Sequence, residues 1–445
     1  MLNITKKPEF LFFMQNYLYY LLYDAVMIPK IDDYEQFVGR EKIEEIKGIA
    51  LKLEDKHIAH VNSTYSGGGV AEILNSMVVL MNTLRIKTDW RLLNGSHSFF
   101  DVTKKFHNAL QGQNNGLTER SKAIYLDAME RNALMHHFQE HSLIFIHDPQ
   151  PLGLINFVKK KKQPWIWRCH IEIRNADKDV WGFLRHFARR YDGAIFSLPK
   201  YRKRDLDMEQ FFIAPSIDPL SLKNKHLSES RAKNILSKEG IPVNKPILTQ
   251  VSRFDKWKNP LGVLQIFKDV KEREDARLVL IGDMAADDPE GPKIYNKVIK
   301  QAGKMKDVHI ITKKDDLLVN ALQRMSHVVL QNSIREGFGL TVSEALWKET
   351  PVIGTKTGGI PLQVIHKKTG ALVENSRESA DWCVKLIRDD QLRAKMGHEG
   401  KEHVRKNFLI TRQLHDYLHI IERYTGTAAD DVIGAARHFK RLLLK

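Results

Sequence analysis

The chain has 445 residues, of which 42% are hydrophobic, so it is long enough for two or three domains and too apolar to be disordered throughout. Its net charge of +16 suits nucleic acid, anionic lipid or phosphate-bearing substrates. The basic residues are spread along the chain without an aromatic-interleaved pattern, which argues against nucleic-acid binding as the main function. Two cysteines without metal spacing, Cys169 and Cys383, indicate a reducing compartment, and we predict a cytoplasmic protein.

Residues 1–33 are predicted to form an N-terminal extension. The stretch from Phe10 to Pro29 is rich in Leu, Phe, Tyr and Met, but Gln15, Asn16 and Asp24 interrupt it. A membrane-spanning helix needs about 20 mostly apolar residues, and no small-residue cleavage site of the signal-peptide kind is present. The segment therefore favours an amphipathic docking helix or a loose extension, with a membrane span as the alternative.

Strand-like and helix-like segments alternate along the rest of the chain in two series, separated by the polar stretch 221–244. Short apolar runs separated by helices indicate parallel sheets covered on both faces. We predict an α/β protein with two Rossmann-like, doubly wound domains facing a central cleft, over residues 34–218 and 219–408. Residues 409–445 are predicted to form C-terminal helices, and a crossing back to the first domain is one arrangement left open for them. The predicted strands are 57–62, 143–147, 164–170, 194–198, 246–251, 278–282, 308–311, 327–330 and 351–354.

The segment 333–344 is the most informative stretch, because it carries two carboxylates, Glu336 and Glu344, around a glycine-rich turn. The turn follows a strand-like run and leads into a helix-like run. Glycines let the backbone approach a ligand closely, and a helix start presents free N–H groups to an anion. The segment therefore indicates recognition of a phosphorylated, hydroxyl-rich molecule. An ordinary turn with two solvated glutamates is the alternative.

Three further groups follow other predicted strands. Arg253 and Lys258 lie five positions apart across a turn, and a guanidinium beside an ammonium can neutralise a diphosphate. The triplet Gly67–Gly69 fits a loop whose N–H groups approach a phosphate or a sugar. His170 ends a strand-like run, where it could hydrogen-bond a sugar hydroxyl. The alternatives are ordinary surface cations, a tight turn without ligand, and a core histidine.

Taken together, these motifs resemble the retaining glycosyltransferases related to glycogen and sucrose-phosphate synthases (glycosyltransferase family four), which have two Rossmann-like domains in the GT-B fold. More narrowly, several phrases are similar to the trehalose synthases that join nucleotide-glucose to free glucose. Glu172 departs from the family's usual Asp, and 255–259 departs from its Asp-Pro-Trp-Lys-Gly. The resemblance runs from about Tyr34 to Tyr424. The phrases that carry it are 60–72, 105–112, 147–151, 167–171, 214–220 and 250–254.

The resemblance implies a role for each matched residue. Arg253 and Lys258 hold the diphosphate of the donor, and Glu344 accepts from the ribose hydroxyls. Glu336 accepts from hydroxyls of the transferred glucose, and His170 sits by the anomeric centre. The implied catalytic set is Glu336, His170, Arg253 and Lys258. The donor site also takes in Gly68, Gly69, Gly337, Phe338, Gly339 and Leu340, and the acceptor site takes in Asp148 and Gln150.

The implied reaction needs no enzymic nucleophile, because the leaving diphosphate can take the acceptor's proton. No metal site is predicted and no cofactor is required, with Mg²⁺ left open as an activator. The implied partners are ADP- or UDP-glucose, glucose or trehalose, and a second copy of the chain in a homodimer. Two alternatives stay open: a trehalose phosphorylase that uses glucose 1-phosphate and phosphate, and a non-catalytic basic binding protein.

Overall fold

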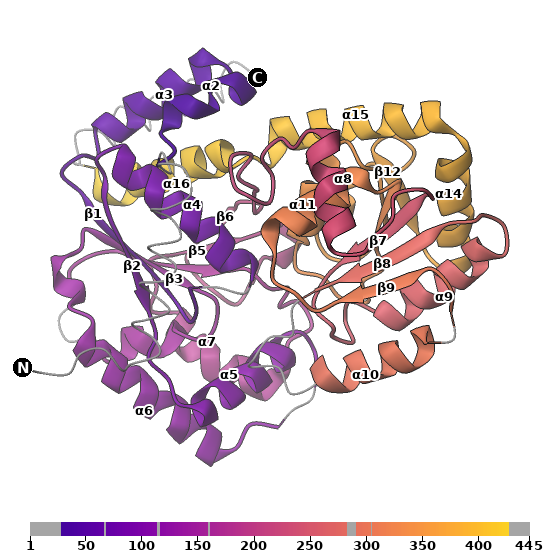
Figure 1. Ribbon diagram of the computed structural model, residues 1–445. Helices are drawn as coiled ribbons and strands as arrows, with labels where there is room; N and C mark the ends of the chain where they lie inside the picture. Colours follow the sequence, from indigo (N-terminus) through magenta and orange to yellow (C-terminus); the bar gives the residue numbers. More distant parts are fainter. Residues whose placement is uncertain are drawn as a thin grey trace, which may run out of the picture.

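The computed structural model describes residues 28–65, 68–113, 116–158, 161–282, 291–303 and 305–426. These residues form two six-stranded parallel sheets with helices on both faces of each, so the predicted pair of Rossmann-like α/β domains is confirmed (Figure 1). The expectations for residues 1–27, for Gly67 and for the tail after residue 426 lie outside the described residues.

The first sheet has the strand order β2-β1-β3-β4-β5-β6. Helices α5, α6 and α7 cover one of its faces, and α3 and α4 cover the other (Figure 1). Its central strands are buried along their whole length, which is why they appear in the sequence as apolar runs. The strands are β1 (His57–Asn62), β2 (Lys87–Leu92), β3 (Leu143–His147), β4 (Trp165–Cys169), β5 (Gly193–Phe196) and β6 (Glu209–Phe212), and the helices are α2 (Glu35–Val38), α3 (Arg40–Leu51), α4 (Gly69–Thr83), α5 (His97–Leu110), α6 (Glu119–Met135) and α7 (Lys178–Ala188).

The second sheet has the order β12-β11-β10-β7-β8-β9. Helices α9, α10 and α14 cover one face, while α8, α11 and α12 pack on the other side. The strands are β7 (Ile247–Val251), β8 (Arg277–Ile281), β9 (Val308–Ile311), β10 (Val328–Gln331), β11 (Val352–Thr355) and β12 (Gly370–Val373), and the helices are α8 (Glu229–Lys238), α9 (Pro260–Lys271), α10 (Gly291–Ala302), α11 (Asp316–Met325), α12 (Leu340–Trp347), α13 (Ile360–Gln363), α14 (Ser376–Arg388) and α15 (Asp390–Asn407).

Each sheet has a switch point, where the strand order reverses. It lies between β1 and β3 in the first sheet and between β7 and β10 in the second. Ligands of open α/β sheets bind beyond the carboxyl ends of the strands at such a point. The residues singled out in the sequence follow these four strands or β4, next to β3. The topology therefore explains why they gather.

The chain passes between the two domains twice, and the two passages are hydrogen-bonded to each other. The amide of Ile217 donates to the carbonyl of Phe408 at 2.8 Å, and the amide of Ile410 donates to the carbonyl of Ile217 at 2.9 Å. Helix α16 (Ile410–Thr425) then lies against α3 and α4 of the first domain (Figure 1). The domain bounds at 218 and 408 remain predictions, and both fall beside this bridge.

Two features bear on the expected compartment: the cysteines and the apolar N-terminal stretch. Cys169 and Cys383 are buried free thiols. Within the described ranges, no helix has both the length and the apolarity that a membrane span requires. The apolar stretch 10–29 lies almost wholly outside those ranges.

Removing residues 1–27 should leave the chain folded, with the activity of its two domains unchanged. Among the described residues, core contacts begin at Ile31, which is 3% exposed, and at Tyr34, whose hydroxyl donates to Asp218 at 3.0 Å. A second truncation that also removes these two side chains should cost on the order of 3 kcal/mol or more of stability. Thermal unfolding and turnover of both truncations against the full chain test this. A first truncation that folds but has no activity would contradict it.

Candidate active site

Glu336 lies in the loop that joins β10 to α12, and three donors hold its carboxylate. Its Oε2 accepts hydrogen bonds from Lys258 Nζ at 2.6 Å, Gln331 Nε2 at 2.8 Å and Ser333 Oγ at 3.2 Å. The residue is 8% exposed. Because three hydrogen bonds converge on one oxygen, the carboxylate is fixed in orientation before any ligand arrives.

The loop from Gly337 to Leu340 packs directly against the first domain. Tyr201 donates its hydroxyl proton to the carbonyl of Gly337 at 2.9 Å. A β-carbon on Gly337 would lie 3.0 Å from the carbonyl oxygen of His170, and one on Gly69 would lie 2.9 Å from Cδ1 of Leu340. Glycine at these two positions therefore lets the two domains approach closely. The structure thus brings together residues from both halves that the sequence could place only on separate strands.

Gly339 and Phe338 have different structural tasks in this loop. Gly339 has a φ of 83°, a left-handed conformation that glycine adopts without strain, and it immediately precedes α12. The Phe338 ring is buried and meets Phe408 edge-on, with ring centroids 5.6 Å apart. Only the backbone of Phe338 is therefore placed to contact a ligand.

Arg253 and Lys258 lie on the loop after β7, which Asp255 organises. Asp255 is 6% exposed, and its Oδ1 accepts from the amides of Trp257 and Lys258 at 2.8 and 2.9 Å. The ammonium of Lys258 is turned toward Glu336, whereas the Arg253 side chain is 42% exposed and only 3.8 Å from Asp255 Oδ2. The loop therefore carries an accessible guanidinium and an ammonium that is paired with Glu336, and their joint role at a diphosphate remains a prediction.

Glu344 is buried within α12 and belongs to a cluster of charges that spans the two domains. Its Oε2 accepts from Gln323 Nε2 at 3.1 Å, and its Oε1 lies 3.9 Å from Lys223 Nζ. Lys223 also pairs with Glu72 of α4 at 2.7 Å, and burial raises the pKa of Glu72 to about 7. Sequence reasoning did not connect Lys223 or Glu72 with Glu344, since neither belongs to a motif of the second domain. The ribose role of Glu344 remains a prediction.

Three histidines form a chain that ends at the site. His60 Nδ1 lies 2.9 Å from His147 Nε2, and His147 Nδ1 lies 3.0 Å from His170 Nε2. Burial depresses the pKa of all three imidazoles, that of His60 to about 3, so they are neutral near pH 7. Such a chain fixes the orientation of the His170 ring through hydrogen bonds from within the core. The sequence pointed to His170 alone.

The two proposed acceptor residues lie just after β3. Asp148 Oδ1 accepts from the amide of His170 at 2.8 Å, and burial raises the pKa of Asp148 to about 6. Asp148 has a φ of 65°, so the backbone turns sharply here. The buried Oε1 of Gln150 has no hydrogen-bond partner among the described residues. Asp148 therefore holds the backbone of His170, and Gln150 keeps an acceptor oxygen that the described residues leave unused.

The raised pKa of Asp148 predicts a specific pH dependence of stability. The folded state binds this proton at about pH 6, whereas an unfolded aspartate binds it at about 3.9, so wild type loses stability as pH rises through this window. In urea titrations, Asp148→Asn should therefore gain on the order of 1–3 kcal/mol relative to wild type between pH 4 and pH 8. Parallel stability profiles for the two proteins would contradict the assignment.

A cavity of 440 Å³ opens beyond the carboxyl ends of β10, β11 and β12. It adjoins the Glu336 loop through Ser333, and its size falls within the range of small-molecule sites. Its lining is mostly polar, and sequence reasoning did not single it out because no motif marks it. The polar lining residues include Asn259, Asn332, Ser333, Thr355, Thr357 and Asn375.

Two doubly wound domains with such a charged site where they meet define a glycosyltransferase of the GT-B fold. Residues 232–403 match the family model "Glycosyl transferases group 1". A solved structure with the same architecture, a trehalose-6-phosphate protein from E. coli bound with UDP-2-fluoro glucose, covers 82% of this chain and 99% of its own, with a TM-score of 0.66 and 14% identity. This likeness confirms the predicted GT-B fold.

The chain belongs to the trehalose synthase family. Residues 60–203 match the model "Trehalose synthase, N-terminal domain". A trehalose synthase from Thermococcus litoralis is 43% identical over 401 residues, which cover 89% of this chain and 97% of the relative. A trehalose phosphorylase from Grifola frondosa is 30% identical, over 85% of this chain and 59% of the relative. The enzyme is therefore a glycosyltransferase of trehalose metabolism, and the resemblance seen in the motifs is confirmed.

Proposed function

We propose that the enzyme transfers glucose from a nucleotide-glucose to free glucose, with retention at the anomeric carbon, and so forms trehalose. The observation that carries the proposal is the 2.6 Å pair between Lys258 and Glu336, which joins the loops beyond the two switch-point strands of the second domain. A cation for the leaving group and an anion for the sugar thus meet at one point. The E. coli neighbour, which is bound with UDP-2-fluoro glucose, supports a nucleotide sugar as the donor.

In the proposed reaction, the bond between the anomeric carbon and the diphosphate oxygen breaks as the acceptor hydroxyl attacks from the same face. The departing diphosphate oxygen takes the hydroxyl proton. Arg253 and Lys258 stabilise the charge that develops on the diphosphate, and Glu336 stabilises the positive character of the sugar. Asp148 and Gln150 are proposed to hold the acceptor beside His170. Transfer then needs no cofactor, and no metal takes part in the bond changes.

A trehalose phosphorylase is the second candidate, because one relative carries that name and the same two cations would hold inorganic phosphate. The two candidates differ in what must leave the sugar. A phosphorylase makes trehalose from glucose 1-phosphate and glucose without any nucleotide, whereas the proposed synthase does not.

The test is an assay of the full chain with glucose and, in separate reactions, ADP-glucose, UDP-glucose or glucose 1-phosphate. Trehalose together with the nucleoside diphosphate is the expected product, and parallel reactions with and without added Mg²⁺ show whether the ion is an activator. Light scattering of the same sample checks the proposed homodimer. Trehalose formed only from glucose 1-phosphate would overturn the proposal in favour of the phosphorylase.

A further inference from the structure

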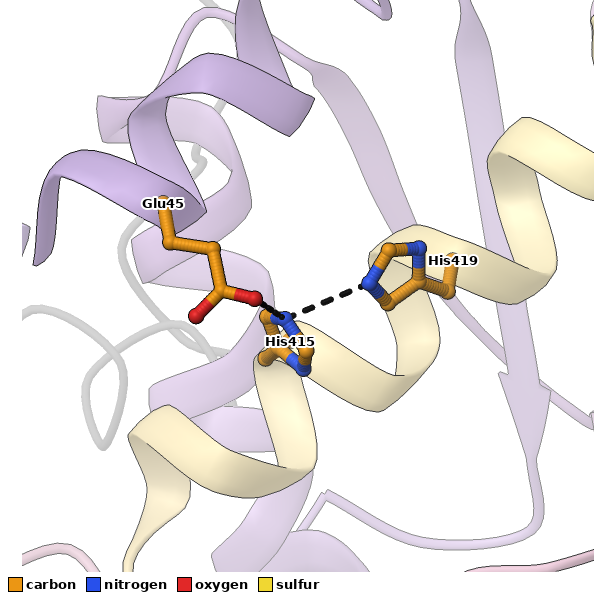
Figure 2. Close-up of side chains that lie close together, drawn as sticks. All are labelled: Glu45, His415 and His419. Atoms are coloured by element: carbon orange, nitrogen blue, oxygen red, sulfur yellow. Dashed lines mark hydrogen bonds and ion pairs between the residues drawn. The ribbon is translucent and has the colours of Figure 1, made fainter. Parts of the chain in front are cut away.

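Three metal-ligating side chains converge where α16 returns to the first domain. Glu45 belongs to α3, and His415 and His419 lie one turn apart on α16 (Figure 2). His415 Nε2 lies 2.8 Å from Glu45 Oε1 and 3.2 Å from His419 Nε2. The three ligand atoms all lie within 4.8 Å of one another. Figure 2 shows a nitrogen of each imidazole turned toward the other ring, with the Glu45 carboxylate beside His415.

The outer nitrogens of both rings face carboxylates. His419 Nδ1 lies 3.4 Å from Glu422 Oε2, and His415 Nδ1 lies 3.8 Å from Asp416 Oδ1. In a neutral imidazole one ring nitrogen carries the proton and the other has a free lone pair. Without an ion, His415 Nε2 hydrogen-bonds Glu45 Oε1 at 2.8 Å, and a divalent cation would take the place of the shared proton between the carboxylate and the two Nε2 atoms. In metal-binding histidines the ring nitrogen away from the ion donates to a carboxylate, a carbonyl or water, and Glu422 and Asp416 lie on that side of these two rings.

We propose that Glu45, His415 and His419 bind a divalent transition metal ion of the zinc class, with water completing the coordination. Zinc binds imidazole nitrogen at about 2.0–2.1 Å, so tetrahedral ligands lie about 3.3 Å apart, close to the observed 3.2 Å between the two Nε2 atoms. Lys42 lies 2.8 Å from the other oxygen of Glu45, Oε2, and so leaves Oε1 available to the ion. The bound ion ties α16 to α3, just after the second passage between the domains.

A second group with ligand geometry, His57, Asp89 and His141, carries no such proposal. Arg91 Nη2 lies 2.8 Å from the same Asp89 oxygen that the two imidazoles approach. The guanidinium therefore already supplies the positive charge that an ion would supply. This group serves as an internal comparison in the experiment.

The experiment measures Zn²⁺ binding by the full chain in competition with a chromophoric chelator. His419→Ala should weaken Zn²⁺ binding on the order of 100-fold or more, because loss of an outer-sphere partner alone costs 10- to 100-fold. The matched control is His398→Ala, which removes an exposed histidine of α15 and should leave the affinity unchanged. Zn²⁺ should also raise the Tm of wild type and of the control, and not that of His419→Ala.

Co²⁺ gives a second readout, since its visible absorption reports nitrogen and oxygen ligands directly. The bands expected for wild type should be lost in Glu45→Gln, a variant that keeps the shape of the side chain. Equal Zn²⁺ affinity in wild type and His419→Ala would overturn the proposal. It would also be overturned if His57→Ala abolished binding while His419→Ala did not.

Discussion

Replacing Glu336 with glutamine is expected to lower turnover about 100-fold or more while leaving the fold intact. The carboxylate is 8% exposed and fixed by three donors, so its charge acts at short range on a sugar that becomes positive in the transition state. Glutamine keeps the size and one acceptor oxygen for those donors. The loss should therefore fall on the chemical step rather than on stability.

Single-turnover rates and thermal unfolding, measured side by side, test this expectation. Glu272→Gln is a matched control, because it makes the same chemical change at an exposed position just after α9. That control should have wild-type turnover and Tm. Turnover of Glu336→Gln within a few-fold of wild type would remove Glu336 from the catalytic set.

Arg253→Ala and Lys258→Ala should each lower kcat/KM for the nucleotide-glucose by about 10- to 100-fold, the range expected for a lost hydrogen bond to a charged group. Lys258→Ala should be the more damaging of the two, because it also leaves Glu336 without its 2.6 Å partner. Since both cations act on one diphosphate, the double variant should lose less than the product of the two single effects.

Calorimetry with two ligands isolates the diphosphate contribution. Affinity for the nucleoside diphosphate should fall in both variants, whereas affinity for the nucleoside alone should not change. Lys256→Ala is the control on the same loop, where the ammonium lies 4.9 Å from the centre of the Trp257 ring. Unchanged affinity for the nucleoside diphosphate in both variants would refute the assignment.

The central strands could be predicted from the sequence because they are buried on both faces and therefore apolar throughout. Three outer strands were missed. Strands β2 and β6 carry exposed and half-exposed polar side chains and so have no apolar run, and β12 has only four residues and begins with a glycine. The sequence also indicated that the glycine-rich turn leads into a helix, and α12 indeed begins at Leu340, directly after Gly339.

The parts of the site that were missed depend on contacts between distant residues. His60 and His147 look like ordinary strand residues until β1, β3 and β4 lie side by side. The spacing of His415 and His419, four positions apart on a predicted helix, was visible in the sequence. Their third partner, Glu45, lies 370 positions earlier than His415, and only the return of α16 brings it near.

That return has a consequence for the order in which the protein folds. Helix α16 supplies Leu414, Tyr417 and Leu418 to the core of the first domain, yet it is synthesised after the whole second domain. Domains generally fold as they leave the ribosome, the N-terminal one first. Here we expect the reverse, with the second domain complete while the first still exposes the apolar face that α16 will cover. A chain that ends at Leu409 should accordingly resist protease in its second domain and be digested in its first.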